Sequence, residues 1–69
     1  MTFQLNGQEY IELMKLLKFM GLTDTGGDTK QAIDEGLVQV NGLQELRRRR
    51  KLRAGDEVLF QGTTIVIAQ

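Results

Sequence analysis

The apolar positions of this 69-residue chain follow a helical spacing first and a strand-like alternation later. Between Glu9 and Met20 they recur every three or four residues, which predicts a helix with one buried face. Gly21 is placed to end that helix, because glycine adopts the left-handed backbone conformation that other residues resist. The predicted buried face consists of Tyr10, Leu13, Met14, Leu16, Leu17 and Met20.

A second, shorter helix is predicted from about Gly26 to Glu35, with Ala32 and Ile33 on its buried side. Thr25 stands directly before it, and Asp28 follows Thr25 by three residues. This spacing is typical of a helix start at which the threonine hydroxyl caps a free backbone N–H group.

After Gly36, which is placed to stop the second helix, the apolar positions alternate with polar ones. The dipeptide Asn41-Gly42 is the strongest short-range signal of a β-hairpin. The chain is therefore expected to form one α+β domain, residues 1–69, in which two helices pack on a small antiparallel sheet in the order β-α-α-β-β-β. An exposed final strand would permit a dimer, but a monomer is expected. The predicted extended segments are Thr2–Leu5, Val38–Val40 with its return arm Leu43–Leu46, Val58–Phe60 and Thr63–Ala68.

Charge is distributed very unevenly over a chain whose formal net charge is zero. Residues 47–53, called the basic run below, hold six of the nine Lys and Arg residues. Residues 1–46 hold three cations against seven carboxylates, and residues 54–69 hold two carboxylates and no cation. Crowded like charges repel one another, so such a cluster is destabilising unless an anion neutralises it. If the basic run is extended, Leu46 and Leu52 would attach it to the core at both ends.

A charge cluster of this size has several possible readings. It can be a solvated face, a membrane-surface anchor, a docking site for an acidic protein or a nucleic-acid site, because short Lys/Arg-rich segments are weak motifs. The acidic remainder of the chain would confine any anionic ligand to this one patch.

The composition limits the other function classes. The chain has neither histidine nor cysteine, which removes the usual general base, the usual metal ligands and any disulfide. No apolar segment approaches the ~20 residues that span a bilayer, and the first residues do not resemble a signal peptide. We therefore expect a cytoplasmic protein that is not an enzyme and needs no metal or cofactor.

The order of several short motifs resembles the S4-type RNA-binding domain, and most closely its short stand-alone bacterial members, the YbcJ-like proteins. The resemblance covers about Tyr10 to Phe60. For the family it implies an αL motif, in which two helices and a β-hairpin hold structured RNA. The segments that carry the resemblance are Thr25–Lys30, Ile33–Gly42, Glu45 with Arg47, Lys51-Leu52 and Gly55–Val58.

The resemblance implies that RNA is bound by the basic run and by one face of the two helices. Glycines in the first turn of the second helix would let its free N–H groups reach a phosphate oxygen. Local sequence alone favours a flexible turn there, and the Asp28 carboxylate already fills part of the role of an anion. The candidate RNA-binding residues are Lys18, Thr25, Gly26, Gly27, Lys30, Arg47, Arg48, Arg49, Arg50, Lys51 and Arg53.

Two departures from the longer, ribosomal-type members concern the helix starts. Those members usually place an arginine where this chain has Glu12, and Ser-Arg where it has Thr25-Gly26. The basic run is expected to replace both missing cations. A docking module for an acidic protein, such as a ribosomal or assembly protein, is the alternative reading.

The aromatic residues bear on the kind of RNA that is expected. The chain has no tryptophan, and its four aromatic residues occupy positions that look like core. A platform for single strands needs exposed aromatic rings. We therefore expect recognition of folded or double-stranded RNA through its shape, its phosphates and its 2′-hydroxyl groups. The four aromatic residues are Phe3, Tyr10, Phe19 and Phe60.

Overall fold

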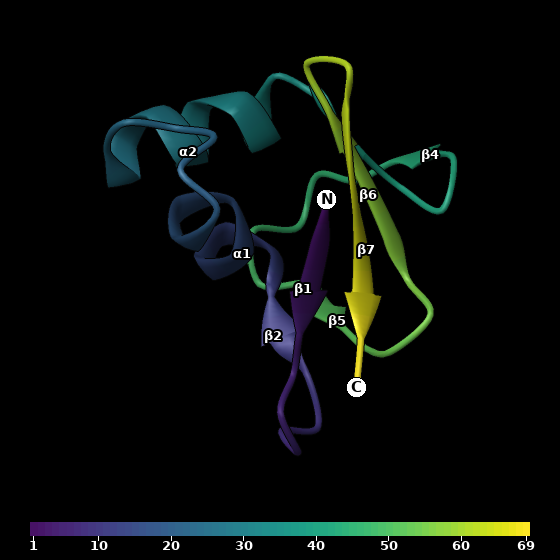
Figure 1. Cartoon of the computed structure of the whole chain (residues 1–69). Helices are drawn as coiled ribbons and strands as arrows, with labels where there is room; N and C mark the ends of the chain where they lie inside the picture. The colour runs from purple at the N-terminus through teal and green to yellow at the C-terminus, as the bar shows by residue number, and fades with distance from the viewer.

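The computed structural model describes all of residues 1–69 and places two helices against one face of a five-stranded sheet (Figure 1). The helices are α1, Leu13–Phe19, and α2, Gly26–Asp34. A second, two-stranded sheet lies at the start of α1. The strands are β1 (Thr2–Gln4), β2 (Ile11–Glu12), β3 (Val38–Val40), β4 (Leu43–Gln44), β5 (Lys51–Leu52), β6 (Glu57–Phe60) and β7 (Thr63–Ala68).

The larger sheet has the strand order β1-β7-β6-β3-β4 and is mixed. The class α+β is confirmed, but the sheet is not wholly antiparallel, because β1 pairs with β7 in parallel. An alternating pattern identifies a strand without giving its direction. The last strand is also not at an edge as predicted, since β1 covers the open side of β7 and leaves β1 and β4 as the edge strands.

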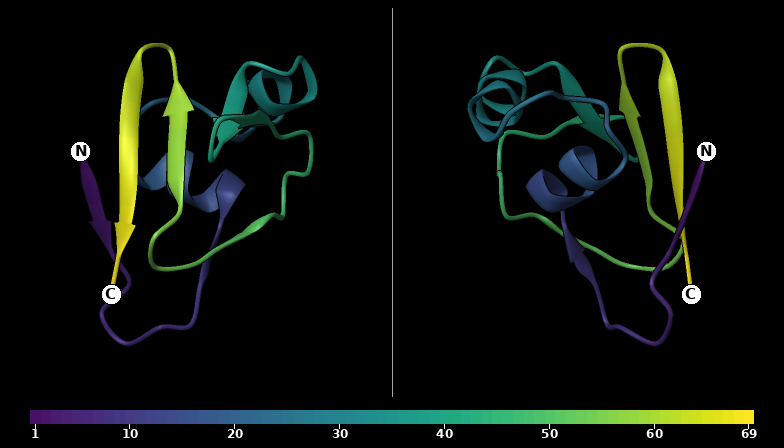
Figure 2. Two further views of the ribbon diagram at one scale, coloured as in Figure 1. Left: turned by 90° about the vertical axis from the view of Figure 1, so that its right-hand side faces the viewer. Right: turned by 60° about the vertical axis from the view of Figure 1, so that its left-hand side comes forward.

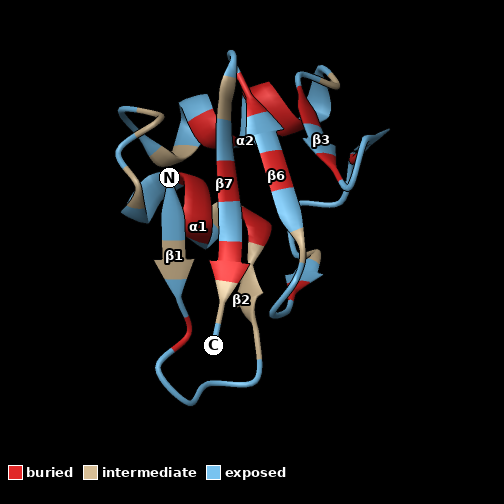
Figure 3. Ribbon diagram, turned by 45° about the vertical axis from the view of Figure 1, so that its right-hand side comes forward, coloured by how far each residue is buried: buried red, intermediate tan, exposed pale blue.

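The core lies between the helices and the inner face of this sheet. Along β6 and β7 buried and exposed residues alternate, as Figure 3 shows. Apolar residues of both helices, both sheets and the segment after β1 form one continuous cluster. The helical spacing and the strand-like alternation of the sequence predict such a cluster. Its members are Leu5, Leu13, Leu16, Leu17, Ala32, Ile33, Val38, Val40, Leu52, Val58, Phe60, Ile65 and Ile67.

The first helix begins four residues later than predicted. The residues before it, Ile11 and Glu12, pair instead with Leu52 and Lys51 as an antiparallel ribbon. The pairing attaches the end of the basic run to the core, because Leu52 is fully buried. This tertiary contact overrides the helical spacing of the local sequence.

The turns around the second helix and the hairpin form as predicted. The Asp28 N–H group donates to the Thr25 hydroxyl at 3.1 Å, so Thr25 caps α2. Asn41 and Gly42 both have positive φ, 53° and 82°, which is the geometry of a tight hairpin between β3 and β4.

Two apolar residues predicted to be inside lie at the surface. Leu46 is 54% exposed, because the chain turns away from the core after β4. Phe19, the last residue of α1, is 73% exposed and contacts Phe3 edge-to-face with ring centroids 5.3 Å apart. Neither α1 nor α2 combines the length and the apolar character that crossing a membrane requires.

Candidate nucleic-acid interface

The basic run belongs to the segment that connects β4 to β6 in the chain, and this segment passes beside both helices (Figure 2). The basic run is not extended over its whole length, so the condition under which Leu46 and Leu52 would both attach it to the core is not met. Its backbone turns at Arg48 and Arg49, and the Arg50 N–H group donates to the Arg47 carbonyl oxygen at 3.2 Å. Only Lys51 and Leu52 are paired as a strand.

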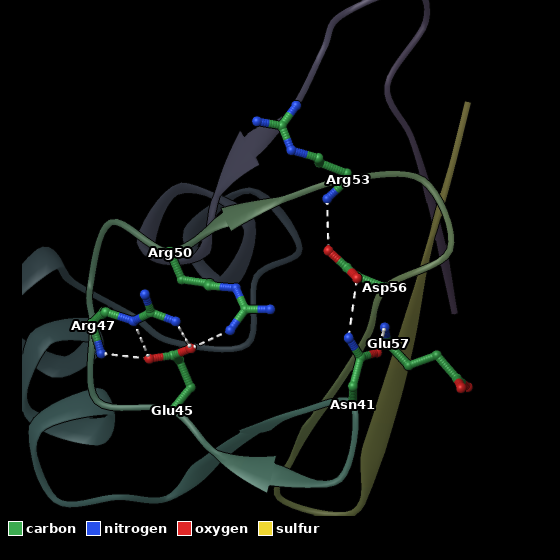
Figure 4. A network of polar contacts seen from close by, with 7 residues as sticks. All are labelled: Asn41, Glu45, Arg47, Arg50, Arg53, Asp56 and Glu57. Carbon is green, nitrogen blue, oxygen red and sulfur yellow. Dashed lines mark hydrogen bonds and ion pairs between the residues drawn. The ribbon is translucent and has the colours of Figure 1, made fainter.

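The turn is organised around a buried carboxylate, Glu45. The Arg47 backbone N–H and Nε–H groups both donate to Glu45 Oε2 at 3.0 Å. A second Arg47 nitrogen and an Arg50 nitrogen donate to Oε1 at 3.1 Å and 2.7 Å. Figure 4 shows the two guanidinium groups converging on this one side chain, which is only 8% exposed. The Arg47 hydrogen bond is the main cause that lowers the pKa of Glu45 to about 2, against the opposing effect of burial.

Two backbone hydrogen bonds fasten the basic run to α1. The first N–H groups of that helix, on Leu13 and Met14, donate to the carbonyl oxygens of Arg50 and Arg48 at 2.9 Å and 3.0 Å. The side chain of Glu12, which precedes the helix, makes no capping bond. The carbonyl groups of the run therefore satisfy N–H groups that helix starts leave without a partner.

Arg48 connects the basic run to α2. It meets Asp34 in a two-bonded pair, with Arg48 Nε and a terminal nitrogen donating at 3.0 Å and 2.5 Å. The Arg48 hydrogen bond lowers the pKa of Asp34, and the charge of Lys30 lowers it further. Lys30 and Arg48, two predicted site residues, thus lie close to the same carboxylate.

The outer cations of the run are held only loosely. Arg49 is 85% exposed and approaches Glu12 at 3.9 Å, and Arg53 approaches the exposed Glu9 at 3.6 Å. The Lys51 Nζ atom lies over the Tyr10 ring, 5.0 Å from its centroid. Exposed pairs of this kind are worth about 0–1 kcal/mol, so an incoming phosphate can replace them.

The remaining predicted residues form a second group at the start of α2. A methyl group added to Gly26 would lie 3.8 Å from Lys18 Nζ, so this ammonium group is next to the first turn. Gly26 and Gly27 carry N–H groups of that turn, where a helix supplies no acceptor. The Thr25 hydroxyl and carbonyl oxygens are already used by Asp28 and Thr29. Thr25 is thus a helix cap, and its hydroxyl keeps its own O–H donor.

The surface of the run is hollowed. A concavity of about 870 Å³ is lined by residues 46–51, five of which are cations. The five arginines of the run share four carboxylates, Glu9, Glu12, Asp34 and Glu45, and Lys51 has no ion pair, so a positive excess remains. The arrangement suits an extended anion such as a phosphate backbone.

Sequence reasoning missed the carboxylates that shape the site. Glu45 stands two residues before Arg47, and that spacing was the one available signal of their contact. The Asp34–Arg48 pair joins residues 14 positions apart and has no local signal.

The Glu45 pair makes a testable contribution to acid stability. Since the folded pKa of about 2 lies below the ordinary value of 4.5, the stabilisation is complete above pH 4.5. It is lost as the pH falls from 4.5 towards 2, and it amounts to at most about 3 kcal/mol. Urea unfolding measured at a series of pH values should show this loss in the native chain and a flatter profile in Glu45→Gln. Parallel profiles of the two proteins would contradict the assignment.

The fold and the position of the run define an S4 domain. The S4 domain family model matches residues 3–68, nearly the whole chain, and the chain belongs to that family. It is 41% identical over 66 residues to "Putative RNA-binding protein YbcJ" of Escherichia coli (strain K12), covering 96% of this chain and 94% of that protein. The same identity and coverage hold for "Uncharacterized protein YbcJ" of Shigella flexneri. The solution structure of YbcJ from E. coli matches with a TM-score of 0.75 at 40% identity, over 99% of this chain and 86% of that one. That structure is described as revealing an αL motif involved in RNA-binding.

Proposed function

We propose that this chain is a non-catalytic RNA-binding domain that holds structured RNA through the basic run and the adjoining helix face. The observation that carries the proposal is the fixed geometry of the run. Glu45 and the start of α1 hold its backbone, while its outer cations have only weak, exposed partners. Membership of the S4 family and the RNA-binding description of the similar structure support the same function.

The two groups of site residues have different roles in this proposal. The basic run supplies most of the attraction to phosphates, because arginine forks bind two phosphate oxygens at once. Lys30, Lys18 and the Gly26-Gly27 turn lie on or beside α2 and orient the RNA. Arg47 and Arg50 act chiefly on Glu45 and shape the run.

The experiment is a titration of the labelled protein with a blunt-ended hairpin RNA, followed by fluorescence anisotropy and by backbone amide shifts. We expect saturable binding and shift changes confined to the basic run, the start of α1 and the Lys30 side of α2. Absence of binding would contradict the proposal. Shifts centred on the outer sheet face, around Leu59 and Val66, would contradict the assigned site.

The resemblance to a family named after a ribosomal protein favours ribosomal or ribosome-associated RNA as the target. Competition between a ribosomal RNA fragment and a transfer RNA for the same protein tests this choice. Stronger competition by the transfer RNA would contradict it.

Docking of an acidic protein is the second candidate function. One observation favours it: the exposed Leu46 lines the same concavity as the cations, and apolar contacts are typical of protein interfaces. RNA and an acidic partner would compete for the run. If structured RNA fails to bind while a candidate acidic protein is retained at 0.15 M salt, roughly physiological ionic strength, the docking function replaces RNA binding.

A further inference from the structure

Phe19 is an exposed aromatic residue on the helix that supports the basic run. It is 73% exposed, although it ends a helix whose other large apolar residues face the core. It contacts Phe3 edge-to-face, at an interplanar angle of 85°, and this contact favours one orientation of the ring. An isolated apolar side chain at a surface needs no explanation, but a ring held in place and still exposed offers a flat surface for stacking.

A line of positive charge leads from the basic run to this ring. Arg49 approaches Glu12 at 3.9 Å, and Lys15 approaches the same carboxylate at 3.7 Å. Positions 12, 15 and 19 follow the i, i+3, i+7 spacing of one helix face. Phe19 thus lies on the face of Lys15, about 6 Å further along the axis at 1.5 Å per residue.

A hollow of about 310 Å³ lies beside the ring, and its lining residues suit the edge of a nucleobase. Its side chains are aromatic, apolar or neutral polar, and none is charged. Thr2, Gln4 and Asn6 are among its lining residues, and the hydroxyl and amide groups of their side chains make no hydrogen bond within the chain. Such groups supply both donors and acceptors, as the edge of a nucleobase requires. The lining residues are Thr2, Phe3, Gln4, Asn6, Phe19 and Met20.

We propose that Phe19 stacks an unpaired nucleobase that flanks the structured part of the RNA held by the basic run. The preferred ligand is therefore a stem with a single-stranded tail or bulge, and not a blunt duplex. Exposed bases stack readily on aromatic rings, and sequence-specific contacts to RNA are made mostly to unpaired nucleotides. This inference rests on the proposed function, since the cations must first hold the stem.

The test compares two hairpin RNAs that share one stem, one of them blunt and one with a short single-stranded tail. The native protein should bind the tailed RNA about tenfold more tightly, which lies within the range measured for stacking of one base. A tail made of abasic nucleotides should lose this advantage, because it keeps the phosphates and lacks the bases. Phe19→Ala should bind both hairpins alike, with its affinity for the blunt stem unchanged.

Two variants separate stacking from general loss of apolar surface. Leu43→Ala removes a side chain as exposed as Phe19, 73%, from the hairpin, and should keep the tenfold preference. Phe19→Trp introduces the only tryptophan of the chain, whose emission should be quenched by the tailed RNA and not by the abasic one.

The possible outcomes are distinct. If neither hairpin binds, the proposed function itself fails, and the stacking fails with it. If both hairpins bind equally to the native protein, or if the preference survives Phe19→Ala, stacking is overturned while RNA binding stands. The Phe3–Phe19 surface would then be left to a protein partner.

Discussion

Replacing Arg49, Lys51 and Arg53 together with alanine is expected to weaken binding of structured RNA by at least about 100-fold. None of these side chains belongs to the Glu45 cluster, and none has a close ion pair. Hydrogen bonds to charged groups contribute about 1.5–3 kcal/mol each, so the loss of three phosphate contacts exceeds two orders of magnitude. Anisotropy titration of a blunt hairpin RNA measures the effect.

The stability of this triple variant should hardly change. The pairs that it removes are exposed and are worth about 0–1 kcal/mol each, and relief of crowding among the remaining cations offsets part of that. The charge-retaining variant Arg49→Lys with Arg53→Lys is the matched control and should lose less than about tenfold in affinity, since the phosphates still meet a positive charge. An unfolded triple variant, or one that binds RNA normally, would contradict the role of these residues.

Replacing Arg47 and Arg50 with alanine should instead lower the stability of the fold. Both guanidinium groups donate to Glu45, whose carboxylate would be left buried without a partner. Breaking a fully buried ion pair by removing one partner costs about 3–5 kcal/mol. Because the Arg47 side chain is 70% exposed, we expect a smaller loss of about 2 kcal/mol, measured by urea unfolding at neutral pH.

A third substitution tests the cause of that loss. Adding Glu45→Met to the Arg47→Ala, Arg50→Ala variant removes the stranded charge and should recover most of the lost stability. It should not restore RNA binding, because the turn that presents Arg48 and Arg49 depends on the Glu45 cluster. If the double variant were as stable as the native chain, the cluster would have no structural role.

The interface therefore combines two kinds of arginine within one short segment. Arg47 and Arg50 donate to the buried Glu45 carboxylate and shape the chain, although the Arg47 side chain is itself 70% exposed, whereas Arg49 and Arg53 only approach their partners at 3.9 Å and 3.6 Å. Arg48 lies between these classes, since its exposed pair with Asp34 ties the run to α2 and can still be exchanged for phosphate. In the free protein the paired carboxylates neutralise part of the charge of the run, which reduces the repulsion among its six cations.

Much of the fold could be predicted because local patterns and tertiary packing agree. The cap at Thr25, the hairpin at Asn41-Gly42 and the buried Ala32 and Ile33 all appear where the sequence places them. The start of α1 could not be predicted, because pairing of Ile11 with Leu52 depends on a segment 41 positions away. Neither could the parallel direction of β1.

The clustering of the candidate site residues could be predicted from the sequence, but the geometry within the cluster could not. The sequence shows the cluster of six cations directly, but the fold determines which carboxylates pair with them. The exposed position of Phe19 was likewise hidden, since its spacing resembles that of a core residue. Because Phe19 is exposed, the ligand that we propose is a stem with an unpaired flank, whereas the sequence alone predicts a duplex recognised by its shape.

The salt dependence of RNA binding tests the central claim most directly. If the basic run and its neighbours neutralise four to six phosphates, the logarithm of the association constant should fall with the logarithm of salt concentration at a slope of about −3 to −5. The Arg49, Lys51 and Arg53 alanine variant should show a slope shallower by about 2–3. An affinity that stays constant between low and physiological salt would contradict the account, because binding would not then depend on these cations.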